Sequence, residues 1–121
     1  MSNPVGLTIR TAQMEVLAAD LRQRFEDRLR EDLVRYWPDA CRELGDAGLR
    51  GRVREGVERA QAHGVSAQRD VLRFLNVVFA LGPGFESDVR YPWAADILGA
   101  PGVPAAVRMD QLCAHVQQVL G

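Results

Sequence analysis

The sequence predicts a single all-α domain of five or six helices around one buried helix, at about residues 66–81. Residues 71–81 are apolar on nearly every side, so other elements must enclose them, and the segment is too short to span a bilayer. The segments before and after it repeat apolar residues at three- and four-residue spacing, as amphipathic helices do. With 121 residues, 47% of them hydrophobic, the chain can fill one core. We therefore expect a lead-in over residues 1–10 and one helical domain over residues 11–121.

The composition and the N-terminal sequence indicate which kinds of partner and which compartment to expect. The formal net charge is −1, from 15 basic and 16 acidic residues, which argues against a general binder of polyanions. The N-terminus lacks the pattern of a secretory signal, and no stretch reaches transmembrane length, so we expect a cytoplasmic protein. Cys41 and Cys113 each lie in an apolar helical pattern, which predicts reduced, buried thiols.

The first helix is predicted over about residues 11–36. Its apolar residues recur every three or four positions, as in one buried stripe: Met14, Leu17, Leu21, Phe25, Leu29, Leu33 and Tyr36. Acids precede bases by four residues on the other side, for example Asp20 before Arg24 and Glu26 before Arg30, and we expect these pairs to lie in solvent.

Proline and glycine mark the next boundaries. Pro38 ends the first helix and opens a short one over residues 39–44, which stops at Gly45. A third helix is predicted over residues 47–63, with Asp46 as its N-cap. Gly64 suits the left-handed position after it, and Ser66 is the predicted cap of the central helix.

Residues 82–92 form the longest irregular stretch, and they mix apolar anchors with charges. Such loops often carry function. A short helix begins at Pro92, and a last helix is predicted over about residues 104–120. The candidate partner-binding residues are Phe85, Glu86, Asp88, Arg90, Tyr91 and Trp93.

A DNA-binding regulator is the alternative function, with residues 47–81 as a helix-turn-helix-like pair. The resemblance lies in Ala60, Gly64 and the Val65-Ser66 that opens the second helix. It fails six residues after the glycine, where Asp70 replaces the apolar residue that would seat the recognition helix. We therefore expect nucleic-acid binding to be the less favoured class.

The sequence offers no recognisable catalytic, cofactor or metal motif. Cys113 and His115 lie two residues apart on a helix, so they project to opposite sides and cannot chelate one ion. Ser87 has no nearby histidine or nucleophile-elbow pattern, and residues 82–84 lack the context of a phosphate loop. We expect a protein that is not an enzyme and that holds no metal or cofactor.

One resemblance covers about residues 9–98. It is carried, in order, by Ile9-Arg10, Gln13-Met14, Arg24-Phe25-Glu26-Asp27-Arg28, Trp37-Pro38, Cys41, Leu44-Gly45, His63-Gly64-Val65, Arg69-Asp70-Val71, Phe74-Leu75, Phe79-Ala80-Leu81-Gly82, Phe85 and Pro92-Trp93-Ala94. Together these resemble small all-helical accessory proteins encoded beside type VI secretion spike, PAAR and effector genes in proteobacteria. The resemblance implies an adaptor, chaperone or immunity-type role, with a spike, PAAR or effector protein as the partner. It implies no catalytic residues, and it leaves the oligomeric state open.

Overall fold

The computed structural model describes the backbone of residues 4–121 and the side chains of residues 13–121. Its elements are α1 (Pro4–Tyr36), α2 (Pro38–Ala62), α3 (Gln68–Leu81), the 3₁₀ turn η1 (Phe85–Ser87), α4 (Pro92–Leu98) and α5 (Ala105–Leu120). No strand occurs between residues 4 and 121, so the predicted all-α class is confirmed.

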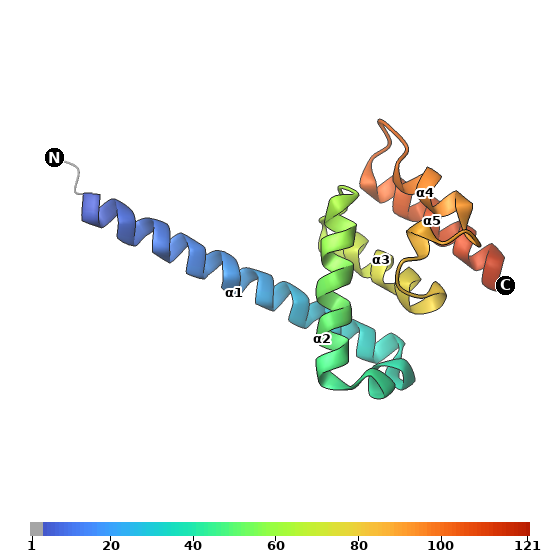
Figure 1. Ribbon diagram of the computed structural model, residues 1–121, viewed down its shortest axis with the longest axis horizontal. Helices are drawn as coiled ribbons and strands as arrows, with labels where there is room; N and C mark the ends of the chain where they lie inside the picture. Colours follow the sequence, from blue (N-terminus) through green and yellow to red (C-terminus); the bar gives the residue numbers. More distant parts are fainter. Residues whose placement is uncertain (1–3) are drawn as a thin grey trace.

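The helices form a compact body from which one long helix projects. α2 crosses the C-terminal part of α1, α3 packs against α1, α2 and α5, and α4 packs against η1 and α5 (Figure 1). The N-terminal part of α1 extends away from this body, on the side opposite to α4 and α5 (Figure 1).

The predicted central helix is confirmed as α3. Val71, Phe74 and Leu75 are fully buried, and Val77 and Val78 are nearly so. The Phe74 ring lies 5.2 Å from the ring of Phe85, measured between centroids. The chain after α3 therefore folds back over it and completes its enclosure.

Most of the predicted helix boundaries are confirmed. α1 ends at Tyr36, and Pro38 opens α2. Within α2, Gly45 has a φ of 72°, a left-handed conformation that suits glycine, so the helix breaks where the sequence predicted. Gly64 likewise has a φ of 75° at the turn into α3.

Two predicted caps are wrong. The N-cap position of α3 is Ala67, not Ser66, and no side chain caps that helix. The chain turns one residue later than predicted because Val65 is pulled fully into the core, which leaves Ser66 exposed in the connection. Inside α2 the non-helical dihedrals fall at Gly45, so Asp46 is already a helical residue and not the N-cap; its carboxylate accepts a hydrogen bond from Arg50 at 3.1 Å.

α1 differs from the prediction at its N-terminal end. The helix begins at Pro4 rather than at residue 11, so helical backbone replaces most of the predicted lead-in; residues 1–3 lie outside the described residues. The predicted buried stripe is also wrong in part. Met14 is 62% exposed, and Leu17 and Leu21 are also exposed, because α2 crosses only the C-terminal part of α1 and leaves the rest uncovered. Tyr36, the last residue of α1, is exposed as well.

Candidate protein-interaction surface

The segment of α1 that leaves the body is the most unusual surface of the molecule. Every residue from 13 to 24 is exposed, and we call this segment the α1 arm. Its large apolar side chains are Met14, Val16, Leu17 and Leu21, with exposures of 62%, 71%, 50% and 56%. Met14, Leu17 and Leu21 lie on one face of the helix, whereas Val16 lies on the opposite face. A face of exposed apolar side chains is typical of an interaction site.

The arm shares one ridge of side chains with the core. Leu17, Leu21, Phe25, Leu29 and Leu33 follow each other at four-residue intervals, the spacing of a ridge that packs into the groove of another helix. Leu29 and Leu33 are fully buried, and Phe25 is partly buried against the core. The ridge thus passes from the core into solvent, where its apolar character continues without a partner among the described residues.

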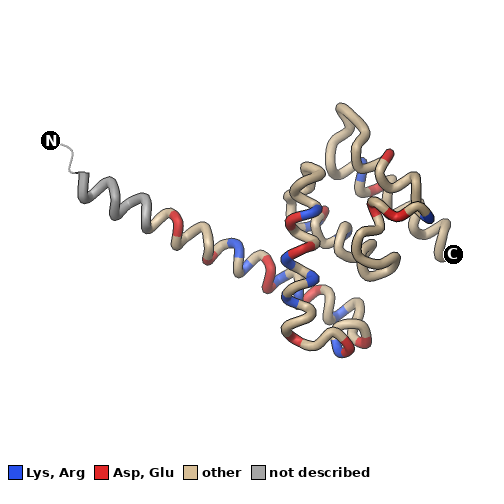
Figure 2. The backbone as a smooth tube through the Cα atoms, in the orientation of Figure 1, with Lys and Arg blue, Asp and Glu red and all other residues tan. Residues whose placement is uncertain are grey.

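The arm has four charged side chains, and two of them form an ion pair with each other. Asp20 and Arg24 form an ion pair at 3.1 Å within the helix, as the sequence predicted. Glu15 and Arg22 make no ion pair with any residue whose side chain is described. Figure 2 shows the two acidic positions of the arm followed by its two basic positions along α1. Among the side chains that the structure describes, the arm therefore has one acid and one base without an ionic partner.

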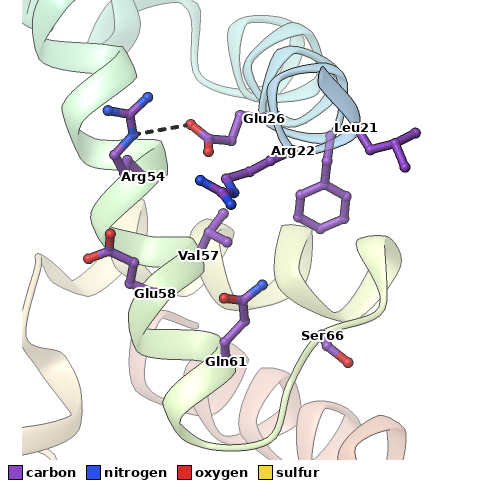
Figure 3. Close-up of a pocket in the computed structure, with 9 residues that line it drawn as sticks. Leu21, Arg22, Glu26, Arg54, Val57, Glu58, Gln61 and Ser66 are labelled. Atoms are coloured by element: carbon purple, nitrogen blue, oxygen red, sulfur yellow. Dashed lines mark ion pairs between the residues drawn. The ribbon is translucent and has the colours of Figure 1, made fainter. Parts of the chain in front are cut away.

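A cleft of about 810 Å³ opens beside the base of the arm, between α1 and α2 (Figure 3). Its lining residues are Leu21, Arg22, Phe25, Glu26, Arg54, Val57, Glu58, Gln61 and Ser66. Apolar side chains thus lie among charged and amide groups, and Leu21 belongs to both the cleft and the arm. The cleft and the arm therefore form one continuous surface.

Glu26 lines this cleft, and its ion pair differs from the one that the sequence predicted. It is buried at 6% exposure and forms an ion pair with Arg54 of α2 at 3.6 Å, drawn as a dashed line in Figure 3. The sequence predicted a solvated pair with Arg30, but Arg30 instead pairs with Asp27. The crossing of α2 over α1 decides this, because it places Arg54 against a residue that helical spacing alone would leave in water.

Two of the candidate partner-binding residues are not on the surface. Phe85 is 1% exposed and packs on Phe74, and Glu86 is 7% exposed. The Glu86 carboxylate forms an ion pair with Arg59 of α2, and its Oε2 atom has no hydrogen-bond partner. The prediction that both residues contact a partner is therefore wrong. The turn at η1 directs them inward, where Phe85 packs on α3 and Glu86 pairs with α2.

The other four candidates lie together at the surface, at the opposite end of the body from the arm. The Arg90 guanidinium donates to Asp88 at 2.8 Å and lies 5.2 Å from the centroid of the Tyr91 ring. Hydrogen bonds from the Arg90 side chain and backbone lower the pKa of Asp88. Between ring centroids, Trp93 lies 5.8 Å from Tyr91 and 4.8 Å from His115, and it is tilted against both rings.

We call Tyr91, Trp93 and His115 the aromatic cluster. Tyr91 and Trp93 are partly buried, so each covers core residues with one side and meets solvent with the other. The sequence does not indicate that His115 belongs to this surface, because it lies on α5 and only tertiary packing brings it to Trp93. The neighbouring Val89 is 93% exposed. This is a second surface of amphipathic rings, a type of residue that is enriched in protein interfaces.

The described residues offer no assembled metal site. No group of three or more His, Cys, Asp or Glu side chains is placed to hold one ion within the described part of the chain. Cys41 is buried, and burial raises the pKa of its thiol. Among the described helices, none combines the length and the apolar character needed to cross a membrane.

We compared the chain with protein-family models, curated proteins and solved structures. No family model, no curated protein and no solved structure matches this chain.

Proposed function

We propose that this protein is a non-enzymatic protein-binding accessory and that the α1 arm is its binding element. The observation that carries the proposal is that residues 13–24 form a helix exposed at every position. Four large apolar side chains would stay in water on this arm unless a partner covered them. Covering apolar area contributes about 25 cal/mol per Å², so a partner helix gains stability by packing there.

The proposed setting is a type VI secretion cluster, with a spike, PAAR or effector protein as the partner. The resemblance of residues 9–98 to accessory proteins of such clusters supports this setting. An adaptor, chaperone or immunity-type protein acts by binding, and an exposed amphipathic helix fits each of these roles. The aromatic cluster offers the same partner, or a second one, another surface at the far end of the body.

The arrangement of α3 does not favour the DNA-binding alternative. Within α3 only Arg69 is exposed, so this helix has no free face to place in a groove. Arg73 is held by ion pairs with Asp70 and Asp110 rather than left to contact phosphate. Asp70 is 8% exposed, which shows that the acid at the failed position of the motif lies inside the fold.

Affinity capture from the source cells, followed by mass spectrometry, tests the proposal. Two matched variants, Leu21→Asp and Ala19→Asp, place the same charge on faces of the arm about 160° apart. Leu21→Asp is expected to lose the captured protein, whereas Ala19→Asp, on the polar side, is expected to retain it. Recovery of a spike, PAAR-bearing or effector protein supports the setting. Equal capture by both variants, or capture of DNA that salt releases, contradicts the proposal.

A further inference from the structure

We infer that the partner of the α1 arm is the arm of a second copy of this chain, packed antiparallel, with the crossing point between Leu17 and Ala18. This inference rests on the proposed function, because it assumes that the arm is a protein-binding surface. It names a second copy as the occupant of the arm, so the secretion partner meets the dimer at the aromatic clusters, and Leu21→Asp loses that partner by breaking the dimer. Three independent features of the arm point to it: the order of its apolar side chains, the order of its charges and the position of the neighbouring cleft.

The apolar face of the arm is complementary to itself when it is reversed. Met14, Leu17, Ala18 and Leu21 lie within about 100° of one another around the helix axis. A two-fold axis between Leu17 and Ala18 places each Met14 opposite Leu21 of the other copy. It also places each Leu17 opposite the small Ala18, and a large side chain facing a small one is how ridges fill grooves.

The charges select the antiparallel direction. In this register, Glu15 of one copy lies within about 3 Å, along the axis, of Arg22 of the other, and the symmetry creates this pair twice. In a parallel pair without stagger, Glu15 of one copy and Arg22 of the other would lie about 10 Å apart along the axis, so neither charge would meet its opposite. Asp20 and Arg24 already neutralise each other within each helix. The two charges that remain unpaired in the described structure are thus the ones that the antiparallel pairing joins.

The cleft supplies area that the arm alone lacks. The twelve residues of the arm form a face about 18 Å long and 10 Å wide, well below the roughly 800 Å² that each partner buries in a stable interface. α1 begins at Pro4, so each arm has further helical turns on its N-terminal side. In the antiparallel pair, these turns of the second copy pass Arg22 of the first copy and run alongside its Phe25. Phe25 lines the cleft of about 810 Å³ between α1 and α2, so the end of one helix can rest against the body of the other copy.

The antiparallel arrangement also leaves the aromatic clusters free. Each cluster lies at the far end of its body from the arm, so pairing of the arms directs the two clusters outward (Figure 1). The dimer then offers two identical surfaces, and a partner with repeated sites gains avidity from binding both.

The molar mass in solution, measured by light scattering after size-exclusion chromatography, tests the inference on the full chain. The wild type is expected to show twice the 13.4 kDa of one chain. Glu15→Arg and Arg22→Glu are each expected to raise the dissociation constant of the dimer about tenfold or more, because each turns both cross-pairs into repulsions. The double variant E15R/R22E restores opposite charges and is expected to recover the wild-type constant. Helix content and melting of each variant at a dilution where the wild type is monomeric serve as the folding control.

Each alternative outcome contradicts a different statement. A wild type that is monomeric at high concentration, or a double variant that is no better than the single ones, overturns the antiparallel dimer. If the wild type is monomeric but Leu21→Asp still loses a captured protein, the occupant is a different partner and the proposed function stands. If the wild type is monomeric and Leu21→Asp captures as well as Ala19→Asp, both the inference and the proposed function are wrong.

Discussion

The Nη1 atom of Arg108 donates a hydrogen bond of 2.7 Å to the backbone carbonyl of His63, which joins α5 to the end of α2. The same guanidinium donates to the carbonyls of Leu98, at 2.6 Å, and Val103, at 3.0 Å. Arg108 is only 8% exposed. One buried cation therefore satisfies three carbonyl groups where separate segments of the chain meet, a role for which a planar fork of donors is suited.

Replacing Arg108 with alanine is expected to lower the free energy of unfolding by about 2–4 kcal/mol, because buried carbonyl groups lose charged donors. Arg108→Lys keeps the charge but not the planar fork, so it should recover only part of the loss. Urea denaturation measures both. The matched control is Arg50→Ala, whose ion pair with Asp46 is exposed and should change stability by less than about 1 kcal/mol. Equal effects of Arg108→Ala and Arg50→Ala would contradict this role of Arg108.

A partly buried polar contact joins the junction of α1 and α2 to α3. The Nε1–H of Trp37 donates to the Oδ1 atom of Asn76 at 3.0 Å. We expect Trp37→Phe and Asn76→Ala each to destabilise the fold, with a coupling energy of about 0.5–1.5 kcal/mol in a double-mutant cycle. Thermal and chemical denaturation of the two single variants and the double variant give this energy. Purely additive effects would show that the hydrogen bond contributes nothing to stability.

Two glycines of α2 predict opposite effects of the same substitution. A Cβ atom at Gly56 would lie 2.2 Å from Cδ2 of the buried Leu75, so Gly56→Ala is expected to destabilise the protein by about 1–3 kcal/mol through overpacking. At Gly51 nothing lies within 4 Å of such an atom, and Gly51→Ala is expected to stabilise by about 0.5–1 kcal/mol through helix propensity. A melting temperature that rises for Gly56→Ala, as it should for Gly51→Ala, would show that α2 and α3 are not in close contact at Gly56.

The shared ridge of α1 predicts a sharp difference between its two ends. Leu33→Ala removes a fully buried side chain and should destabilise by about 2–5 kcal/mol. Leu21→Ala, on the exposed part of the same ridge, should change the stability of the monomer by no more than about 0.5 kcal/mol. Urea denaturation at low protein concentration gives both values. A large loss in the dilute Leu21→Ala variant would mean that the arm packs on its own body.

The pairing of Asp88 with Arg90, near the aromatic cluster, leads us to expect that folding stability depends on pH. Hydrogen bonds from Arg90 lower the folded-state pKa of its carboxyl group below the ordinary value. A lowered pKa stabilises the fold above the ordinary aspartate range, and this stabilisation is lost as the pH falls through the folded-state pKa. The difference in stability between wild type and Asp88→Asn should therefore shrink as the pH falls. Carbon-detected NMR titration of Asp88 should give a midpoint below that of an unfolded peptide; an ordinary midpoint would contradict the pairing.

The sequence by itself determined the helices and much of the core. The breaks at Pro38, Gly45 and Gly64 follow from backbone chemistry that acts within a few residues, and the structure contains each of them. The continuous apolar character of residues 71–81 required that this helix be enclosed, and α3 lies at the centre of the fold. These properties are local, so one sequence suffices to predict them.

Only the tertiary structure decided which apolar residues are covered and which polar groups meet. Periodicity shows that Leu21 and Leu33 share a ridge, but it does not reveal where α2 and α3 pack on α1, and that position leaves Leu21 in water and buries Leu33. In the same way, the contacts of Arg108 with His63 and of Trp93 with His115 join residues that lie far apart in the chain. Burial and pairing depend on the whole arrangement of helices in space, whereas helical spacing describes one helix at a time.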